Sequence, residues 1–248
     1  MPLCRDAETI RPFLEKHRPG TNAIYYPVLN QTGASPRWVR ADDLGHPRAV
    51  ICRTHRFTLY GTDRDAVSRV VEELPRNMRM SFGATQEKYY RLIRRRWRGP
   101  DAGRKTWVTP CYLYALAPGR LVVCRSHRVS PLGPGDAGTI ARYWPYGRSV
   151  RYVVSRIRAL PGCAIRHKGR LVAWALTHDD GSMGFLHVIK EYRGQGMARA
   201  LSTALAERLV RIGIQPFMYI VRNNRASVAL TGSMGFTRRG GYSWFGTV

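Results

Sequence analysis

The sequence predicts an α/β fold of mixed central sheets flanked by helices, arranged in two halves. Strand patterns and helix patterns alternate along the chain, which is typical of α/β proteins. Residues 125–135 form a polar segment dense in turn-forming residues, and such segments often separate domains. A Gly-x-Gly turn between a strand and a helix occurs only in the second half. We therefore expect one domain over residues 1–124 and a second, phosphate-binding domain over residues 125–248.

The composition is that of a folded and strongly basic protein. Its hydrophobic content is 44%, which is ordinary for a globular chain. The 41 Lys and Arg residues outnumber the 16 Asp and Glu residues, for a net charge of +25, and both halves share the excess. RNA is a partner that would use this charge, and a compositional preference for arginine is the other interpretation.

Cysteine usage and hydropathy exclude several classes of protein. The five cysteines are scattered and form no Cys-x-x-Cys pair, so the sequence predicts neither a zinc site nor a disulfide framework. No apolar run reaches the length of a membrane span, and the first residues do not resemble a signal peptide. We expect a cytoplasmic protein with no bound metal and no membrane partner. Nothing in the sequence indicates its oligomeric state.

In the first half, Asp63 is placed to cap a helix, because an aspartate at this position accepts a free main-chain N–H. The expected helices lie near residues 6–17, 63–74 and 86–98, and the expected strands near residues 22–28, 37–41, 48–54, 56–61, 78–82, 107–116 and 121–124.

The second half begins with two helices and a hairpin. The helices are expected over residues 136–143 and 150–160, and the hairpin turns at Lys168-Gly169. A strand over residues 183–188 precedes the glycine turn, and a long helix follows it. One face of that helix carries an apolar stripe that we expect to lie in the core, made of Leu201, Leu205, Leu209 and Ile212. A strand over residues 217–221 and a short helix over residues 225–233 come next.

The glycine turn between the strand and the long helix is the feature that indicates function. Gly194 and Gly196 allow a tight turn in which successive main-chain N–H groups converge on an anion. The helix adds its unpaired N–H groups and the positive end of its dipole. Arg193 and Arg199 supply charge nearby. Such a turn holds a pyrophosphate, although an ordinary glycine-rich connection is the alternative for a Gly-x-Gly sequence alone.

This order of elements resembles the acyl-CoA-binding core of the GNAT superfamily of N-acyltransferases, whose Arg/Gln-x-x-Gly-x-Gly/Ala signature matches residues 193–198. Residues 143–147, 173–176 and 191–193 resemble the glycine N-acyltransferase-like branch more closely, and the resemblance covers residues 129–248. Relatives in that branch pair a degenerate amino-terminal half with a cofactor-binding carboxy-terminal half. The resemblance therefore implies a tandem GNAT-like fold with one cofactor site.

The resemblance also implies acyl-CoA as cosubstrate, with acetyl-CoA as the expected ester. In GNAT relatives the strand before the turn splays from its neighbour and pairs with pantetheine, a role that falls here on the main chain at residues 186–188. Asn224 matches a position that often bonds the pantetheine arm, and a plain helix N-cap is the alternative. The implied cofactor-binding residues are Leu186, Val188, Arg193, Gly194, Gln195, Gly196, Met197, Ala198, Arg199, Asn224 and Ser227.

The sequence departs from the family where proton transfer is concerned. Glycine N-acyltransferases are held to use a Glu where this chain has Ser182, and many GNAT enzymes have a Tyr acid where it has Thr231. One expected replacement is His187, whose ordinary pKa suits proton acceptance. Another is the turn that contains Asp180, which is close enough to act as a base or to attract an ammonium, while Ser182 is a poor base unless an adjacent group activates it. A half-buried strand histidine and a plain Asp-Gly turn are the structural alternatives.

A basic helix in the first half is the expected nucleic-acid surface. Its aromatic neighbours, Tyr89, Tyr90 and Trp97, would add base stacking to phosphate contacts. A solvated helix face is an equally good interpretation of the charge. The arginines on this face are Arg91, Arg94, Arg95 and Arg98.

Together these features predict an N-acyltransferase that carries an acyl group from acyl-CoA to a primary amine, on a small molecule or an aminoacyl ester. One alternative is an RNA-directed GNAT-fold transferase that uses an aminoacyl-tRNA as donor or acceptor. The other is a nucleic-acid-binding protein whose coenzyme A pocket is vestigial.

Overall fold

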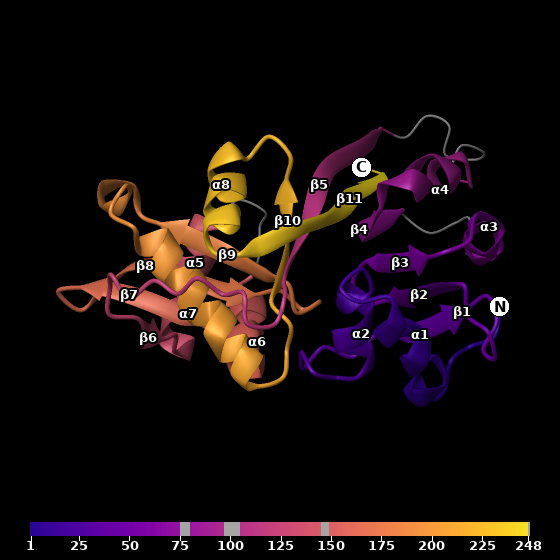
Figure 1. Cartoon of the computed structure of the whole chain (residues 1–248), viewed down its shortest axis with the longest axis horizontal. Helices are drawn as coiled ribbons and strands as arrows, with labels where there is room; N and C mark the ends of the chain where they lie inside the picture. Colours follow the sequence, from indigo (N-terminus) through magenta and orange to yellow (C-terminus); the bar gives the residue numbers. More distant parts are fainter. Residues whose placement is uncertain (75–79, 97–104, 145–148, 248) are drawn as a thin grey trace. The chain divides into compact units, whose positions relative to one another are not determined.

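Residues 1–74, 80–96, 105–144 and 149–247 are described by a computed structural model and fall into two units (Figure 1). The first unit comprises Met1–Leu113, Tyr219–Asn224 and Arg238–Val248, and the second comprises Tyr114–Met218 and Arg225–Thr237. The domain boundary between residues 124 and 125 stays a prediction. The two units are not divided at a single point in the chain, because the late segments Tyr219–Asn224 and Arg238–Val248 belong to the first unit.

Three short helices open the first unit: η1 (Ala7–Ile10), α1 (Arg11–Lys16) and α2 (Asn22–Val28). The strand predicted near residues 22–28 is therefore wrong. Residues 22–27 are all buried, and the Arg18 guanidinium lies over the rings of Tyr25 and Tyr26, 4.7 and 5.2 Å from their centroids. The strand propensity of this aromatic segment is overridden by packing on all sides.

A seven-stranded mixed sheet runs through the first unit in the order β1-β2-β3-β4-β11-β5-β10, and the ends of β5, β10 and β11 are counted in the second unit. β1, β2 and β3 are antiparallel, whereas β4 runs parallel to β3 and antiparallel to β11. Phe82 of β4 stacks on Phe245 of β11 with ring centroids 4.9 Å apart, in the centre of the core. The strands are β1 (Trp38–Ala41), β2 (Ala49–Arg53), β3 (Phe57–Gly61), β4 (Ser81–Gln86), β5 (Thr106–Leu116), β10 (Phe217–Val221) and β11 (Phe236–Thr247).

The remaining helices of this unit are α3 (Arg64–Glu72), η2 (Glu87–Tyr89) and α4 (Tyr90–Arg96). Asp63 caps α3 by accepting the N–H of Ala66 at 2.8 Å, which confirms the predicted cap.

The second unit has a four-stranded antiparallel sheet in the order β6-β7-β8-β9. Helices α5 and α6 bury Trp174 and Phe185 against one face, and α7 packs on β7, β8 and β9 in front of the sheet in Figure 1. The elements are β6 (Ser130–Pro131), η3 (Pro134–Asp136), α5 (Ala137–Tyr143), α6 (Val150–Ala159), β7 (Cys163–His167), β8 (Arg170–Thr177), β9 (Met183–Val188), η4 (Lys190–Tyr192), α7 (Met197–Arg211) and α8 (Arg225–Ser233). The predicted mixed α/β fold is confirmed.

Two local predictions in this unit are wrong. Residues 121–124 form no strand, because their N–H groups bond other partners: Val122 donates to Met234 O at 3.1 Å and Cys124 to Thr203 Oγ1 at 3.2 Å. Ile212 is 52% exposed and not part of the core stripe of α7, because the helix ends at Arg211. No helix in the described ranges is both long and apolar enough to cross a bilayer.

Candidate functional site

The turn that leads from β9 into α7 is a cradle of unpaired main-chain donors, which we call the amide cradle and define as residues 193–199. Gly194 and Gly196 both have φ +79°, a conformation that glycine adopts without the cost of a Cβ. Arg193 N–H donates to Lys190 O, and Arg199 N–H to Gly196 O. Among the described residues, the five N–H groups of residues 194–198 between them have no acceptor. Residues 194–196 are exposed, so their N–H groups are open to an anion at the start of a 15-residue helix.

The side chains of the amide cradle mostly lie away from its opening. Arg193 Nε donates to Val188 O at 3.0 Å, which keeps its charge at the end of β9. Arg199 Nη2 donates to Ser233 O at 3.3 Å, at the end of α8. Met197 is buried, Ala198 is half-buried and Gln195 is exposed. The anion-binding chemistry here belongs to the main chain, and the part of Arg199 in it stays a prediction.

Two polar side chains that the sequence analysis missed lie against the amide cradle. A Cβ on Gly196 would be 3.6 Å from Ser126 Oγ and 4.0 Å from the His127 ring. Ser126 Oγ is 2.9 Å from His127 Nδ1 and 3.2 Å from Cys124 Sγ. The hydrogen bond with Ser126, and then the charge of Arg199, lower the pKa of the Cys124 thiol.

Two contacts with α7 hold this segment in place. Arg125 makes a two-bond ion pair with Glu207, with both N–O distances 2.6 Å, and Cys124 N–H bonds Thr203. The pair lowers the pKa of Glu207. The sequence signal for this segment was only its polarity, which indicated a linker. Its partners Thr203 and Glu207 lie 79 and 82 residues later, so no local pattern reveals them.

β9 offers a free edge with an irregular backbone. It is the last strand of its sheet, while β10 is the last strand of the other sheet. Phe185 has φ +49°, and Phe185 and Leu186 together face the single residue Ala175 on β8, which is a β-bulge. Ile189 N–H donates to Val172 O, so the main-chain groups of Val188 point away from β8. The free edge is where an extended chain can pair with the strand.

His187 lies on β9 in a cluster of three mutually contacting rings with Trp174 and Tyr143. Its ring stacks on Trp174 with centroids 4.7 Å apart and lies 5.0 Å from Tyr143. Burial, and then the charge of Arg193, lower the pKa of His187. The imidazole is therefore neutral at pH 7 and able to accept a proton.

Ser182 and Asp180 belong to a turn at the other end of β9. Ser182 Oγ and Ser182 N–H both donate to Asp180 Oδ1, at 2.5 and 2.9 Å. Five residues of strand separate Ser182 from His187, which is roughly 16 Å at ~3.3 Å per residue. The structure therefore pairs Ser182 with Asp180 but brings neither to His187.

The remaining predicted cofactor residues lie after β10. Asn224 N–H donates to Val221 O, and Asn224 is counted in the first unit. Ser227 lies in α8, where its carbonyl accepts the Thr231 hydroxyl at 2.7 Å. Thr231 is buried and also bonds Met218 Sδ at 3.5 Å, so its hydroxyl is occupied inside the unit.

The predicted nucleic-acid surface is only partly supported. Arg91 and Arg95 are exposed on α4 and Arg94 is half-buried, while Arg98 and Trp97 lie outside the described residues. Tyr89 is buried with its hydroxyl on Gly61 O, and Tyr90 packs on Phe245. The prediction that Tyr89 stacks on bases is therefore wrong, because its ring is buried in the core, whereas the role of half-buried Tyr90 stays a prediction.

Comparison with known proteins finds a family similarity in the second half of the chain. The family model described as FR47-like protein matches residues 162–245. A glycine N-phenylacetyltransferase from Bos taurus is 26% identical over 102 residues, and a glycine N-acyltransferase from Pongo abelii is 24% identical over 103 residues. Each match covers 40% of this chain and 35% of the relative. The chain thus spans about a third of the length of the curated relatives it matches.

Solved structures share the fold over the whole chain. A Drosophila protein of 15% identity superposes with a TM-score of 0.79 and covers 98% of this chain and 94% of its own. A GCN5-related N-acetyltransferase-like protein from Streptococcus suis, at 16% identity, gives a TM-score of 0.60 and covers 98% and 99%. The FR47-like segment and the glycine N-acyltransferase relatives confirm the predicted resemblance to the GNAT superfamily, and the solved structures show that the fold is shared.

Proposed function

We propose that this protein transfers an acyl group, with acetyl as the first choice, from acyl-CoA to a primary amine. The observation that carries the proposal is the run of five unpaired N–H groups at residues 194–198, beside the free edge of β9. An anion cradle and an unpaired strand edge are what a diphosphate on an extended pantetheine chain requires. The names of the curated relatives describe acyl transfer to glycine, which supports an amine acceptor.

Different residues of the chain bind the cosubstrate and transfer the proton. The amide cradle binds the diphosphate of the cosubstrate, and the main chain at Leu186 and Val188 pairs with its pantetheine. The bound thioester supplies the acyl group and a thiolate leaving group. Neutral His187 takes the proton that the amine nitrogen loses, through a water molecule, and contacts with the rings of Trp174 and Tyr143 keep its imidazole oriented. Main-chain N–H groups near the bulge at Phe185 are suited to stabilise the oxyanion.

Ligand-dependent melting of the full chain tests this proposal. Coenzyme A and acetyl-CoA, at 100 times their Kd, are expected to stabilise the fold by about 2.7 kcal/mol and to raise Tm by several degrees. Pantetheine lacks the diphosphate and is the matched control that should give a much smaller shift. A protein whose Tm is unchanged by coenzyme A would contradict the proposal.

Bulk tRNA in the same assay tests the alternative in which RNA is donor, acceptor or ligand. Arg91, Arg94 and Arg95 have no carboxylate within ion-pair distance in the described part of the chain, which favours a polyanion contact there. A shift with tRNA alone, lost between about 50 and 200 mM salt, would favour this alternative over acyl-CoA binding.

Ser126 and His127 are expected to add side-chain contacts to the diphosphate. Replacing both by alanine should weaken coenzyme A binding at least tenfold, because the loss of even one hydrogen bond to an ionised group costs about 1.5–3 kcal/mol. Isothermal titration calorimetry measures the effect. Ser130→Ala is the matched control, since Ser130 follows in the same segment but its hydroxyl bonds Ala164 O. Unchanged affinity in the double variant would exclude this role.

A further inference from the structure

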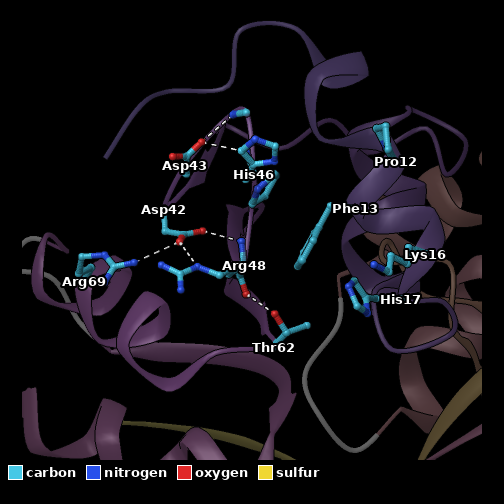
Figure 2. Close-up of a pocket in the computed structure, with 12 residues that line it drawn as sticks. Pro12, Phe13, Lys16, His17, Asp42, Asp43, His46, Arg48, Thr62 and Arg69 are labelled. Atoms are coloured by element: carbon cyan, nitrogen blue, oxygen red, sulfur yellow. Dashed lines mark hydrogen bonds and ion pairs between the residues drawn. The ribbon is translucent and has the colours of Figure 1, made fainter.

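The first unit contains a pocket of its own, far along the sequence from the amide cradle (Figure 2). Its volume is about 780 Å³, within the range of small-molecule sites. α1 forms one wall, with Phe13, Lys16 and His17, and the loop over residues 42–48 forms the other. All the residues that line it belong to the first unit. The acyl transfer proposed above uses none of them.

The loop that forms the second wall is held in one conformation by its own carboxylates. Asp42 Oδ1 accepts the N–H groups of Arg48 and Ala49, both at 2.8 Å, and the Asp42 side chain is only 1% exposed. Asp43 Oδ1 accepts the N–H groups of Gly45 and His46, at 2.7 and 2.9 Å. A wall that is already ordered loses little entropy when a ligand binds to it.

These contacts also decide the charge that the pocket offers to a ligand. Asp42 Oδ2 lies 3.4 Å from Arg69 Nη2 and 3.7 Å from Arg48 Nε, so this carboxylate is neutralised. Lys16, across the pocket, has no carboxylate within ion-pair distance among the described residues. The Arg48 side chain is 54% exposed and reaches its carboxylates only at 3.7 Å, so it retains donors for another anion. The pocket therefore offers the cationic groups of Lys16 and Arg48 to a ligand, which favours an anion.

The wall on α1 supplies an aromatic edge, because Phe13 lines the pocket although only 8% of this residue is exposed. The ring of Phe13 lies 4.8 Å from that of His17 and 6.1 Å from that of Tyr60, and His17 and Tyr60 are 5.7 Å apart. The three rings fix one another, and in Figure 2 the Phe13 ring projects from α1 toward the loop. The ring of a ligand can contact the exposed edge of Phe13 in an edge-to-face arrangement.

We propose that this pocket binds a small organic anion whose acidic group lies between Lys16 and Arg48 and whose flat ring packs on Phe13. Aryl carboxylates and nucleoside monophosphates share this chemistry. The first unit is then a ligand-binding module in its own right.

Titration of the full chain with benzoate, AMP and inorganic phosphate tests the proposal, with the His17 and His46 ring resonances as readout. We expect benzoate or AMP to shift both resonances, and the probe that binds tighter identifies the acidic group. Lys16→Ala and Arg48→Gln should each weaken that binding about tenfold. Lys105→Ala is the matched control, because Lys105 is exposed in the same unit but does not line the pocket.

Three results would overturn the proposal. The first is that neither benzoate nor AMP shifts the two resonances. The second is that the affinity is the same in Lys16→Ala and Arg48→Gln as in the unaltered chain, which would place the ligand elsewhere. Inorganic phosphate that binds as tightly as both ring compounds would remove the planar part of the assignment. Coenzyme A binding is measured separately, so failure here leaves the acyl transfer proposal untouched.

Discussion

Gly196→Ala is expected to weaken acyl-CoA binding about 100-fold. At φ +79° an alanine is strained by roughly 1–2 kcal/mol, and the turn can relax only by rotating its N–H groups out of line. Loss of two hydrogen bonds to an ionised diphosphate, each contributing about 1.5–3 kcal/mol, gives an effect of this size. Calorimetric titration with coenzyme A measures it.

Gly213→Ala is the matched control for this variant. Gly213 follows the other end of α7 and has φ +76°, and a Cβ added there would meet no atom within 4 Å, so the backbone strain is similar. Both variants should lower Tm by a comparable amount, while only Gly196→Ala loses affinity. Equal coenzyme A affinities in the two variants would show that the cradle does not bind the cosubstrate.

His187→Gln is expected to lower kcat at least 100-fold with little change in the Kd of coenzyme A. A positioned general base typically contributes about 10²–10⁴ in rate, and glutamine keeps most of the packing against Trp174 and Tyr143 while losing basicity. Release of free coenzyme A thiol in the presence of an amine gives the rate. His167→Gln, an exposed histidine of the same sheet, is the matched control and should leave kcat unchanged.

The pH dependence gives a second readout for His187. Its pKa is lowered from the ordinary value of 6.5 by burial and by Arg193, so the base is active above that lowered pKa and is lost as pH falls through it. The ratio of the wild-type rate to the His187→Gln rate cancels the titration of the acceptor amine. This ratio should fall toward one in acid. A ratio that is independent of pH would assign His187 a structural role.

Prediction from sequence succeeds here where structure depends on neighbours in the chain. The amide cradle is such a case, since Gly194 and Gly196 specify their own backbone angles and Met197 begins the helix that follows. The Asp63 cap is equally local, and so is the hairpin turn at Lys168 and Gly169, both of which have positive φ.

The failures come from contacts between distant parts of the chain. The segment over residues 22–28 has the composition of a strand and becomes a helix because it is buried on every side. Ser126 reaches the cradle only through the pairing of its segment with α7, and Arg199 turns to Ser233 on another helix. The pocket beside Phe13 requires a loop and a helix about 30 residues apart to meet. Rules based on the spacing of residues in a single sequence do not predict contacts between segments that are so far apart in the chain.

The position of β11 sets the order in which this protein can be completed during translation. β4 is paired on one side with β3 and on the other with β11, whose residues 236–247 leave the ribosome after all the other strands. The nascent first unit therefore waits with one edge of β4 unpaired, although amino-terminal domains generally fold first. An open edge is a template for pairing with a neighbouring chain, so aggregation during synthesis is the hazard that this topology carries.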